Sequence, residues 1–490
     1  MKHLSKSKVV GAQQCPKKLW LELYKPGEAE VTESAEDLFE TGNRVGELAR
    51  QMYGEGRLVS PENDLSLALK ESRQLIDSGF AGPIYEATFS TGGILVRLDV
   101  LLPDGDGHRI VEVKSSTEVK EVHLLDCAIQ CWVARQSGLT ITRVALAHID
   151  TAFVYPGNGR YEGLLKEVDV TAEIEPIIAE VPALLASAQL VAAGAEPERD
   201  MGSHCRKPYD CGFMGYCKRL DGSEYPVSIL PNGGKTIEKL RRQGYRDLRD
   251  VPDGQLKSRT HQRVWRVTQS GVPELNTAEA SAAIQSWAYP RYYLDFETLG
   301  EAIPIWAGTR PYERIPFQWS CHVEDSPGVF RHQGFLADGT DAPMRACAET
   351  LVACIGDHGA VIAYNASFEI GVLNEQAQRY PDLAPTLTAI AERVVDLLPV
   401  AKAAFYAPSM MGSWSIKRVL PALVPELRYD ALDDVQHGIA AQQAFREIMA
   451  PQTAPERRQQ LRESLEAYCT LDTWAMVRIA ERLSNSLEAD

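Results

Sequence analysis

Two sets of acidic residues, one in each half of the chain, have the types and the spacing of divalent metal centres. The first set is Asp99, Glu112 and Lys114, and the second is Asp295, Glu297, Glu369 and Asp472. Carboxylate oxygens are the hard ligands that Mg²⁺ and Mn²⁺ prefer, and a neighbouring lysine can orient or activate water. The sequence therefore predicts two centres for metal-dependent hydrolysis.

The composition limits the class of protein. A chain of 490 residues, 44% of them hydrophobic, is too long for a single core and predicts two or three domains. The N-terminus lacks the apolar segment of a secretory signal and no run of 18 apolar residues occurs, so we expect a cytoplasmic protein without a membrane partner. In that reducing compartment the ten cysteines are expected to be thiols or metal ligands.

Strands are expected to position the first acidic set. Segments 84–89, 93–102 and 108–114 are rich in β-formers and separated by glycine-containing turns, which predicts an antiparallel meander. Helices over 34–53 and about 121–136 and a strand over 143–149 complete a mixed α/β layer. Asp99 lies near the end of the second strand. Glu112 and Lys114 point to one face of the third, where the carbonyl of Val113 could join the ligands. An exposed hairpin with solvated charges is the alternative.

These residues, with Gln130 on the following helix, resemble the PD-(D/E)XK nuclease superfamily, in particular its RecB-like branch and the CRISPR-associated iron-sulfur exonucleases. The resemblance implies catalytic roles for Asp99, Glu112, Lys114 and Gln130, and a further acidic ligand at Glu86. The branch carries a metal-binding histidine on its first helix, and this chain has none there. Glu47 is expected to take its place, with a solvated helix position as the alternative.

Four cysteines are spaced as ligands of a soft metal site. Cys15 is far from the trio Cys205, Cys211 and Cys217, whose members are separated by five residues each. Thiolates select iron-sulfur clusters or zinc, and zinc sites more often use pairs two residues apart. The pattern resembles the [4Fe-4S] clasp of the same nuclease branch; zinc is the alternative. The other six cysteines are expected to be structural: Cys127, Cys131, Cys321, Cys347, Cys354 and Cys469.

A basic segment is expected to connect the two domains. The formal net charge of −16 is unfavourable for a nucleic-acid binder. The stretch from Lys235 to Arg266 nevertheless carries ten lysines and arginines, so it is the best candidate for a phosphate-facing surface. Two short helices are expected there, similar to a helix-hairpin-helix element that binds phosphates. A helical spacer with a solvated basic face is the alternative.

The second acidic set is expected on a strand and two helices. The sequence YYLDFET at 292–298 predicts a buried strand with Asp295 and Glu297 on one face. Strands over 315–324 and 328–336, a helix over about 342–356 and a strand-helix pair carrying Glu369 follow. The last long helix places Tyr468 and Asp472 one turn apart.

These motifs resemble the DEDD exonucleases of the ribonuclease H-like fold, in the DnaQ-like group, with Glu369 in place of the usual aspartate. The resemblance implies that four carboxylates hold two metal ions, that Tyr468 positions the attacking water, and that Asp396 is a supporting acid. A strand and helices with incidental acids are the alternative.

Together, the sequence predicts an α/β protein in three parts. A PD-(D/E)XK nuclease domain with an iron-sulfur clasp spans 1–220, a helical connector spans 221–287, and a ribonuclease H-like 3′ to 5′ exonuclease spans 288–490. This combination resembles a bacterial family that joins such a RecB-like module to a YLDFET domain. The expected function is a Mg²⁺- or Mn²⁺-dependent DNA exonuclease for single strands or duplex ends, in repair or defence. The alternatives are an RNA exonuclease with a nucleic-acid-binding first domain, and a non-catalytic nucleic-acid-binding scaffold.

Overall fold

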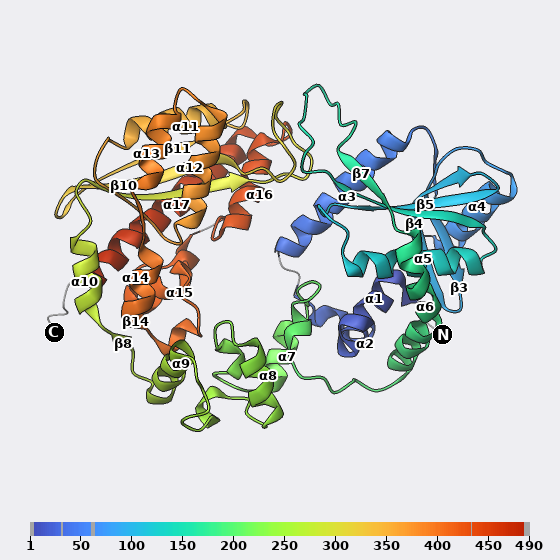
Figure 1. The fold of residues 1–490 in the computed structure, drawn as a ribbon, viewed down its shortest axis with the longest axis horizontal. Helices are drawn as coiled ribbons and strands as arrows, with labels where there is room; N and C mark the ends of the chain where they lie inside the picture. Colours follow the sequence, from blue (N-terminus) through green and yellow to red (C-terminus); the bar gives the residue numbers. More distant parts are fainter. Residues whose placement is uncertain (1–3, 31–32, 60–63, 433, 485–490) are drawn as a thin grey trace. The chain divides into compact units, whose positions relative to one another are not determined.

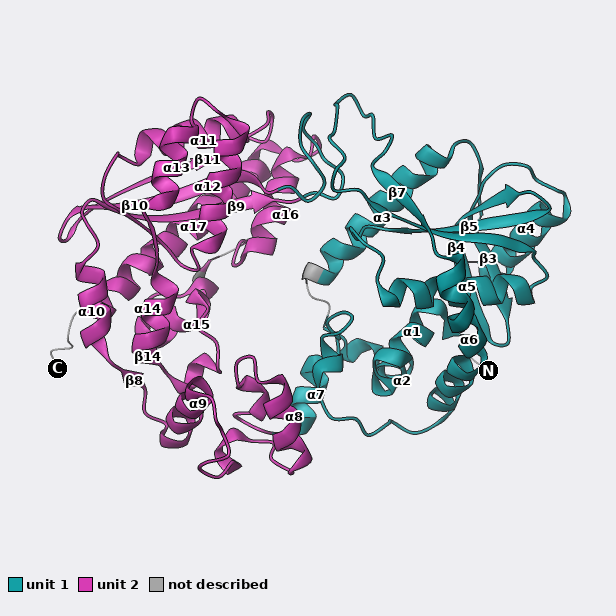
Figure 2. Ribbon diagram, viewed as in Figure 1, with its two compact units in different colours: residues 1–222, 301–313 teal, residues 223–300, 314–490 magenta. Residues whose placement is uncertain are grey.

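The computed structural model describes residues 4–30, 33–59, 64–432 and 434–484. The chain divides into two compact units (Figure 2), unit 1 with Met1–Gly222 and Glu301–Glu313, and unit 2 with Ser223–Gly300 and Arg314–Asp490. Each unit contains a mixed β-sheet with helices packed on it (Figure 1), so the expected α/β class is confirmed. Most of the segment predicted as a connector belongs to unit 2.

Unit 1 is built mainly from elements in the first half of the chain. Its strands are β1 (Leu4–Ser5), β2 (Arg57–Leu58), β3 (Ile84–Thr91), β4 (Ile94–Asp104), β5 (Gly107–Lys114), β6 (Ile141–Ile149) and β7 (Leu165–Asp169). Its α-helices are α1 (Lys6–Gln14), α2 (Pro16–Tyr24), α3 (Glu33–Tyr53), α4 (Leu65–Asp77), α5 (Glu121–Gln136), α6 (Thr171–Ala193) and α7 (Met214–Asp221).

The sheet of unit 1 runs in the order β2-β3-β4-β5-β6-β7, with β1 paired to β4. β3, β4 and β5 form the expected antiparallel meander, and β6 joins β5 in parallel. Gly92 and Gly93 form the β3–β4 turn with φ angles of 57° and 86°, which side chains disfavour. One face packs Leu98 and Ile110 against α5, and the other face packs Val100 and Val111 beside Tyr53 of α3.

Helix α6 is the most apolar long helix of unit 1. Among the described residues it is the one helix long and apolar enough to cross a membrane, a test that core helices of soluble proteins also pass. Five residues along one stripe, from Ile174 to Ala188, are buried, and α6 packs against α5. The acids Glu173, Glu175 and Glu180 interrupt its apolar sequence.

Unit 2 contains the remaining elements. Its strands are β8 (Glu274–Leu275), β9 (Arg291–Leu299), β10 (Ile315–Ser326), β11 (Val329–Leu336), β12 (Ala360–Ala363), β13 (Val394–Asp396) and β14 (Phe405–Tyr406). Its α-helices are α8 (Gly234–Arg242), α9 (Arg259–Ser270), α10 (Thr277–Gln285), α11 (Met344–Cys354), α12 (Ser367–Arg379), α13 (Ala384–Glu392), α14 (Leu397–Ala404), α15 (Ile416–Leu423), α16 (Gly438–Met449) and α17 (Pro455–Ser484).

The main sheet of unit 2 runs in the order β11-β10-β9-β12-β13. β9 is its central strand, antiparallel to β10 and parallel to β12. Residues Leu294 and Phe296 of β9 face a core formed with α11, α12 and α13. The intervening residues of β9 face the opposite side, where α17 packs on β9 and β10. The alternation of a strand therefore separates the acidic residues from this core.

Helix α17 is fixed on the sheet by polar contacts. Gln318 Nε2 donates to the carbonyl oxygen of Leu465 at 2.8 Å. Thr473 Oγ1 lies 2.9 Å from Ser320 Oγ and 2.8 Å from His322 Nδ1. These partners come from alternate residues of β10, so they fix both the position and the rotation of α17.

Candidate metal centres

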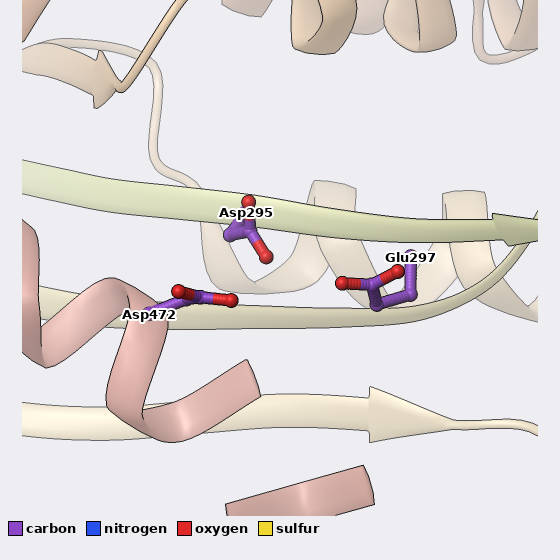
Figure 3. Close-up of side chains that lie close together, drawn as sticks. All are labelled: Asp295, Glu297 and Asp472. Atoms are coloured by element: carbon purple, nitrogen blue, oxygen red, sulfur yellow. The ribbon is translucent and has the colours of Figure 1, made fainter. Parts of the chain in front are cut away.

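Three carboxylates of unit 2 meet between β9 and α17. Ligand oxygens of Asp295, Glu297 and Asp472 all lie within 4.8 Å of one another (Figure 3). Asp295 and Glu297 share a face because they are two residues apart on β9, and the fixed rotation of α17 directs Asp472 toward them. Glu297 and Asp472 are only 9% and 7% exposed. Three close carboxylates, two of them buried, are a donor set that suits Mg²⁺ or Mn²⁺.

Glu369 extends this group from the first turn of α12. It is 3% exposed, and its Oε2 atom is buried without a hydrogen-bond partner. Its negative charge acts on Asp295 and Glu297. A buried carboxylate oxygen normally has a partner, so this atom fits a metal ligand. Asp396 Oδ1 accepts the N–H group of Asn365, before α12, and that of Leu398, in α14. Its charge acts on Glu369, and its role as a supporting acid stays a prediction.

The carboxyl groups of this centre hold protons more strongly than usual. Burial raises the pKa of Glu297 to about 8, and the charge of Asp472 adds to this effect. Burial raises the pKa of Asp295 well above its ordinary value, again with help from Asp472 and Glu297. Burial raises the pKa of Glu369 to about 7. A bound divalent cation would relieve both the burial cost and the mutual repulsion.

Two tyrosines and a lysine surround the carboxylates. The hydroxyl group of Tyr429 donates to Asp472 Oδ1. Lys417 Nζ lies 3.4 Å from the hydroxyl oxygen of Tyr468. Burial lowers the pKa of Lys417, while the charges of Asp472, Glu297 and Asp295 act in the opposite direction. Tyr468, one turn before Asp472 on α17, is buried at 4% exposure, and burial followed by the charge of Asp472 raises its pKa. Tyr468 therefore keeps its proton at neutral pH.

The acidic set of unit 1 also comes together. The N–H group of Val113 donates to Asp99 Oδ2 at 2.8 Å, which ties β4 to β5 beside Glu112. Gln130 Nε2 of α5 donates to Glu112 Oε2 at 2.7 Å, and the Oε1 atom of Gln130 is buried without a partner. Lys114 Nζ lies 2.7 Å from Glu112 Oε1. The carboxylates and the unpartnered amide oxygen again form an oxygen donor set that suits a hard cation.

The two central carboxyl groups of unit 1 have opposite pKa shifts. Burial, followed by the charge of Glu112, raises the pKa of Asp99 to about 8. Burial alone would raise the pKa of Glu112, but Lys114 and Lys6 lower it. Neighbouring carboxyl groups whose pKa values are shifted in opposite directions are typical of functional sites. Asp99 is a mid-strand residue, because β4 continues to Asp104.

Three further metal ligands were predicted for unit 1: Glu86, Glu47 and the backbone carbonyl of Val113. Glu86 interrupts β3 with a φ of 57°, an uncommon value for a residue other than glycine, and lies 3.9 Å from Arg50 Nη1. Burial raises the pKa of Glu86, and the charge of Glu112 adds to this effect. Glu47 is exposed on α3. Its role, and that of the Val113 carbonyl as a ligand, stay predictions.

The four predicted cysteine ligands line a single pocket of unit 1. Cys15 ends α1, and Cys205, Cys211 and Cys217 lie between α6 and the end of α7. The pocket is also lined by Lys17, Lys18, Arg199 and His204, among others. Gln14 Nε2 donates to the carbonyl oxygens of His204 and Tyr209 at 2.8 and 2.6 Å, which holds the end of α1 against the cysteine loop.

The spacing of these thiols bears on the type of metal. Zinc would hold its ligand sulfurs about 3.8 Å apart, given Zn–S bonds of about 2.3 Å in a tetrahedron. Within the described part of the chain, no three of the four sulfurs lie within 4.8 Å of one another. The other six cysteines are buried, in keeping with a structural role.

The basic stretch of unit 2 is partly neutralised by its own acids. Arg249 Nε lies 2.9 Å from Asp247 Oδ1, and Arg263 Nε lies 2.8 Å from Glu274 Oε1. Lys235 and Lys239 on α8 are exposed. The two expected short helices are α8 and α9.

Four residues near the two centres were not predicted from the sequence. They are Lys6 and Asp126 in unit 1, and Lys417 and Tyr429 in unit 2. Asp126 precedes Gln130 by four residues and therefore shares its helix face, a spacing that could have indicated it. The other three lie far in sequence from the residues they contact, and only the fold brings them there.

Comparisons with known proteins cover part of the chain. Residues 292–415 match the family model of a domain of unknown function, DUF2779. This match includes Asp295, Glu297 and Glu369 and ends before α17, which carries Asp472. No curated protein matches the chain. The crystal structure of SSO0001 matches over 44% of this chain and 86% of its own, at 14% identity and a TM-score of 0.24. A similarity this low carries no argument about fold or function.

Proposed function

We propose that the protein is a metal-dependent nuclease with two centres, and that it degrades DNA from an end. The observation that carries the proposal is the convergence of Asp295, Glu297 and Asp472 within 4.8 Å, beside the unpartnered oxygen of Glu369. Two elements distant in sequence bring these acids together against burial and repulsion. Such an arrangement is destabilising unless cations bind there.

The fold of each unit supports the resemblance that carries this function. In unit 2, three antiparallel strands are followed by two parallel ones, β12 and β13, with Asp295 and Glu297 on the central strand. We infer a ribonuclease H-like fold of the DnaQ-like group for this unit. In unit 1, a meander followed by α5 and a parallel β6 presents Asp99, Glu112, Lys114 and Gln130 together. We infer a RecB-like PD-(D/E)XK fold for it.

The roles of the residues follow from their contacts. Divalent ions, when bound, supply a nucleophilic water and stabilise the leaving oxygen of a phosphodiester. Asp295, Glu297, Glu369 and Asp472 would hold them in unit 2. Tyr429 orients Asp472 through its hydroxyl group. Tyr468 keeps its proton and can position the attacking water. In unit 1, Asp99 and Glu112 would hold the ion and Gln130 orients Glu112.

The four cysteines that line one pocket form a thiolate donor set that suits a soft metal group. The spacing of five residues between the members of the cysteine trio is less typical of zinc sites, which more often use pairs two residues apart, and it favours a [4Fe-4S] cluster. We propose that Cys15, Cys205, Cys211 and Cys217 hold such a cluster and join α1 to the end of unit 1. We infer that the protein acts in the cytoplasm and that its partner is DNA.

One experiment separates this function from its alternatives. The full-length protein, purified anaerobically, is incubated with Mn²⁺ and end-labelled single-stranded DNA, duplex DNA or RNA. Shortening from the 3′ end that Asp295→Ala removes, and a second activity that Asp99→Ala or Lys114→Ala removes, are the expected results. Asp77→Ala and Asp341→Ala, at exposed positions of units 1 and 2, are matched controls that should retain both activities.

Each alternative has its own outcome in this assay. Degradation of RNA alone would replace the DNA exonuclease with an RNA exonuclease. Binding of nucleic acid without any cleavage would identify a scaffold. Cleavage that persists in a variant with both Asp99→Ala and Asp295→Ala would refute both assigned centres.

A further inference from the structure

A lysine from the N-terminal segment lies within the carboxylate centre of unit 1. Lys6 Nζ is 2.8 Å from Glu112 Oε1 and 3.3 Å from Asp126 Oδ2. Lys114 Nζ is 2.7 Å from each of the same two carboxylates. The side chains of Glu112 and Asp126 are 1% and 13% exposed, and that of Lys6 is 19% exposed. Two ammonium groups therefore bridge the same two buried carboxylates.

The backbone fixes Lys6 in this position. β1 pairs in parallel with β4, with Leu4 opposite Ile94 and Ser5 opposite Leu95. α1 starts directly after it at Lys6, where the side chain of Ser5 accepts a hydrogen bond from the N–H group of Lys8, and α1 packs on α5. A flexible surface lysine gains little from an ion pair because it loses side-chain entropy. Lys6 is already anchored by strand pairing and a helix cap.

We propose that Lys6 is a positioning residue that takes the place of a second divalent ion, so that the unit 1 centre binds a single ion. This proposal rests on the proposed nuclease function. It assigns to Lys6 the task of holding Glu112 and Asp126 together, at a position that a second ion would otherwise occupy. Lys114 keeps the catalytic role that the resemblance to PD-(D/E)XK nucleases implies.

The charges of the unit 1 centre fit one ion. The carboxylates of Asp99, Glu112 and Asp126 face the ammonium groups of Lys6 and Lys114, which leaves one negative charge. A phosphodiester brings one more, and one divalent cation balances the two. Glu86 has Arg50 as its own cation. A second divalent cation would leave an excess positive charge in a buried site, which is strongly unfavourable.

The centre of unit 2 has the opposite balance. Asp295, Glu297, Glu369 and Asp472 provide four carboxylates, and Lys417 is the cation that acts on three of them. Together with one phosphodiester, the four carboxylates exceed the charge of Lys417 by four negative charges, which two divalent cations balance. Three of these carboxylates lie within 4.8 Å of one another, whereas no three carboxylates of the unit 1 centre do so in the described chain. The two centres of one protein therefore differ in the number of ions they require.

The test counts Mn²⁺ ions directly. A full-length variant with Asp295→Asn and Asp472→Asn removes the unit 2 centre, and free Mn²⁺ is titrated and measured by electron paramagnetic resonance. We expect one bound ion per chain. Adding Lys6→Glu should raise the count to two, because four carboxylates then face Lys114 alone, which is the charge balance of the unit 2 centre. Lys6→Arg should keep the count at one.

A matched control separates this role from a general effect on α1. Lys8→Glu makes the same substitution at a lysine of the same helix that acts on Glu22 instead, and it should leave the count at one. Two ions bound with Lys6 intact would overturn the proposal, as would a count of one in a folded Lys6→Glu variant. A count of two for the Lys6-containing protein or for Lys6→Arg overturns the proposal even if the Lys6→Glu variant does not fold. Absence of cleavage by this variant with a count of one would defeat nuclease activity at the unit 1 centre and leave the role of Lys6 as a positioning residue standing.

Discussion

The substitution Glu297→Gln is expected to stabilise the protein in the absence of Mg²⁺ and Mn²⁺. Glu297 is 9% exposed on the central strand β9, and burial and the charge of Asp472 raise its pKa to about 8. Glutamine has nearly the same shape, carries no charge, and can donate from its amide to a neighbouring carboxylate. The variant therefore removes the burial and repulsion cost that the ionised carboxylate imposes on the wild-type protein.

The size of the effect follows from proton linkage. Each unit by which folding raises a carboxyl pKa costs about 1.4 kcal/mol once the pH exceeds the folded value. A rise from 4.5 to about 8 sets an upper limit of about 5 kcal/mol. Relaxation of the site and the cost of burying an amide reduce this, so we expect a gain of about 2 kcal/mol. For a unit of this size that corresponds to about 4–8 °C in Tm.

The sign of the effect depends on pH. Because the folded pKa of Glu297 is raised, its contribution to stability is fully present below about pH 4.5 and is lost as the pH rises to about 8. The variant should therefore match the wild-type protein at pH 5 and exceed it at pH 8.5. Calorimetry of the full chain in a chelator at both pH values measures this difference. Addition of Mn²⁺ should stabilise the wild-type protein more than the variant.

The control for this prediction is Glu392→Gln, at an exposed position of α13 in unit 2. It should leave Tm unchanged at both pH values. A Glu297→Gln protein that is less stable than the wild type at pH 8.5 would refute the reasoning. So would a gain of equal size at pH 5, since that gain would not come from ionisation.

Two further substitutions test the surroundings of the centres. Tyr429→Phe removes the hydroxyl group that donates to Asp472, so we expect about 10-fold weaker Mn²⁺ binding in unit 2 with an unchanged fold; unchanged affinity would show that Tyr429 does not orient this carboxylate. Cys15→Ala should yield protein without iron or visible colour and with unit 1 selectively destabilised, because the proposed cluster would close a long loop between α1 and the cysteine trio. Colourless wild-type protein with stoichiometric zinc would refute the cluster but keep the clasp, whereas metal retained by Cys15→Ala would refute the clasp.

Local patterns in the sequence predicted most of the elements that carry the candidate sites. Glycine-containing turns and β-rich runs placed β3, β4 and β5, and the predicted helix over 121–136 coincides with α5. The two-residue spacing of Asp295 and Glu297 on a buried strand, and of Glu112 and Lys114 on another, fixed which of them share a face. Side chains alternate between the two faces of a strand with a period of two residues, so these properties can be read from a single segment.

The assembly of each centre depended on long-range contacts that no local pattern contains. Lys6 reaches Glu112 because β1 pairs with β4, and Tyr429 and Lys417 approach Asp472 from segments outside the sheet. The sequence alone determined the residue types of both centres, the strands and helices that carry them, and the α/β class, because spacing and hydrophobic period are local. Only the tertiary structure decided which carboxylates meet, which cations face them, and how strongly their pKa values shift, because burial and charge act between residues that are distant in sequence.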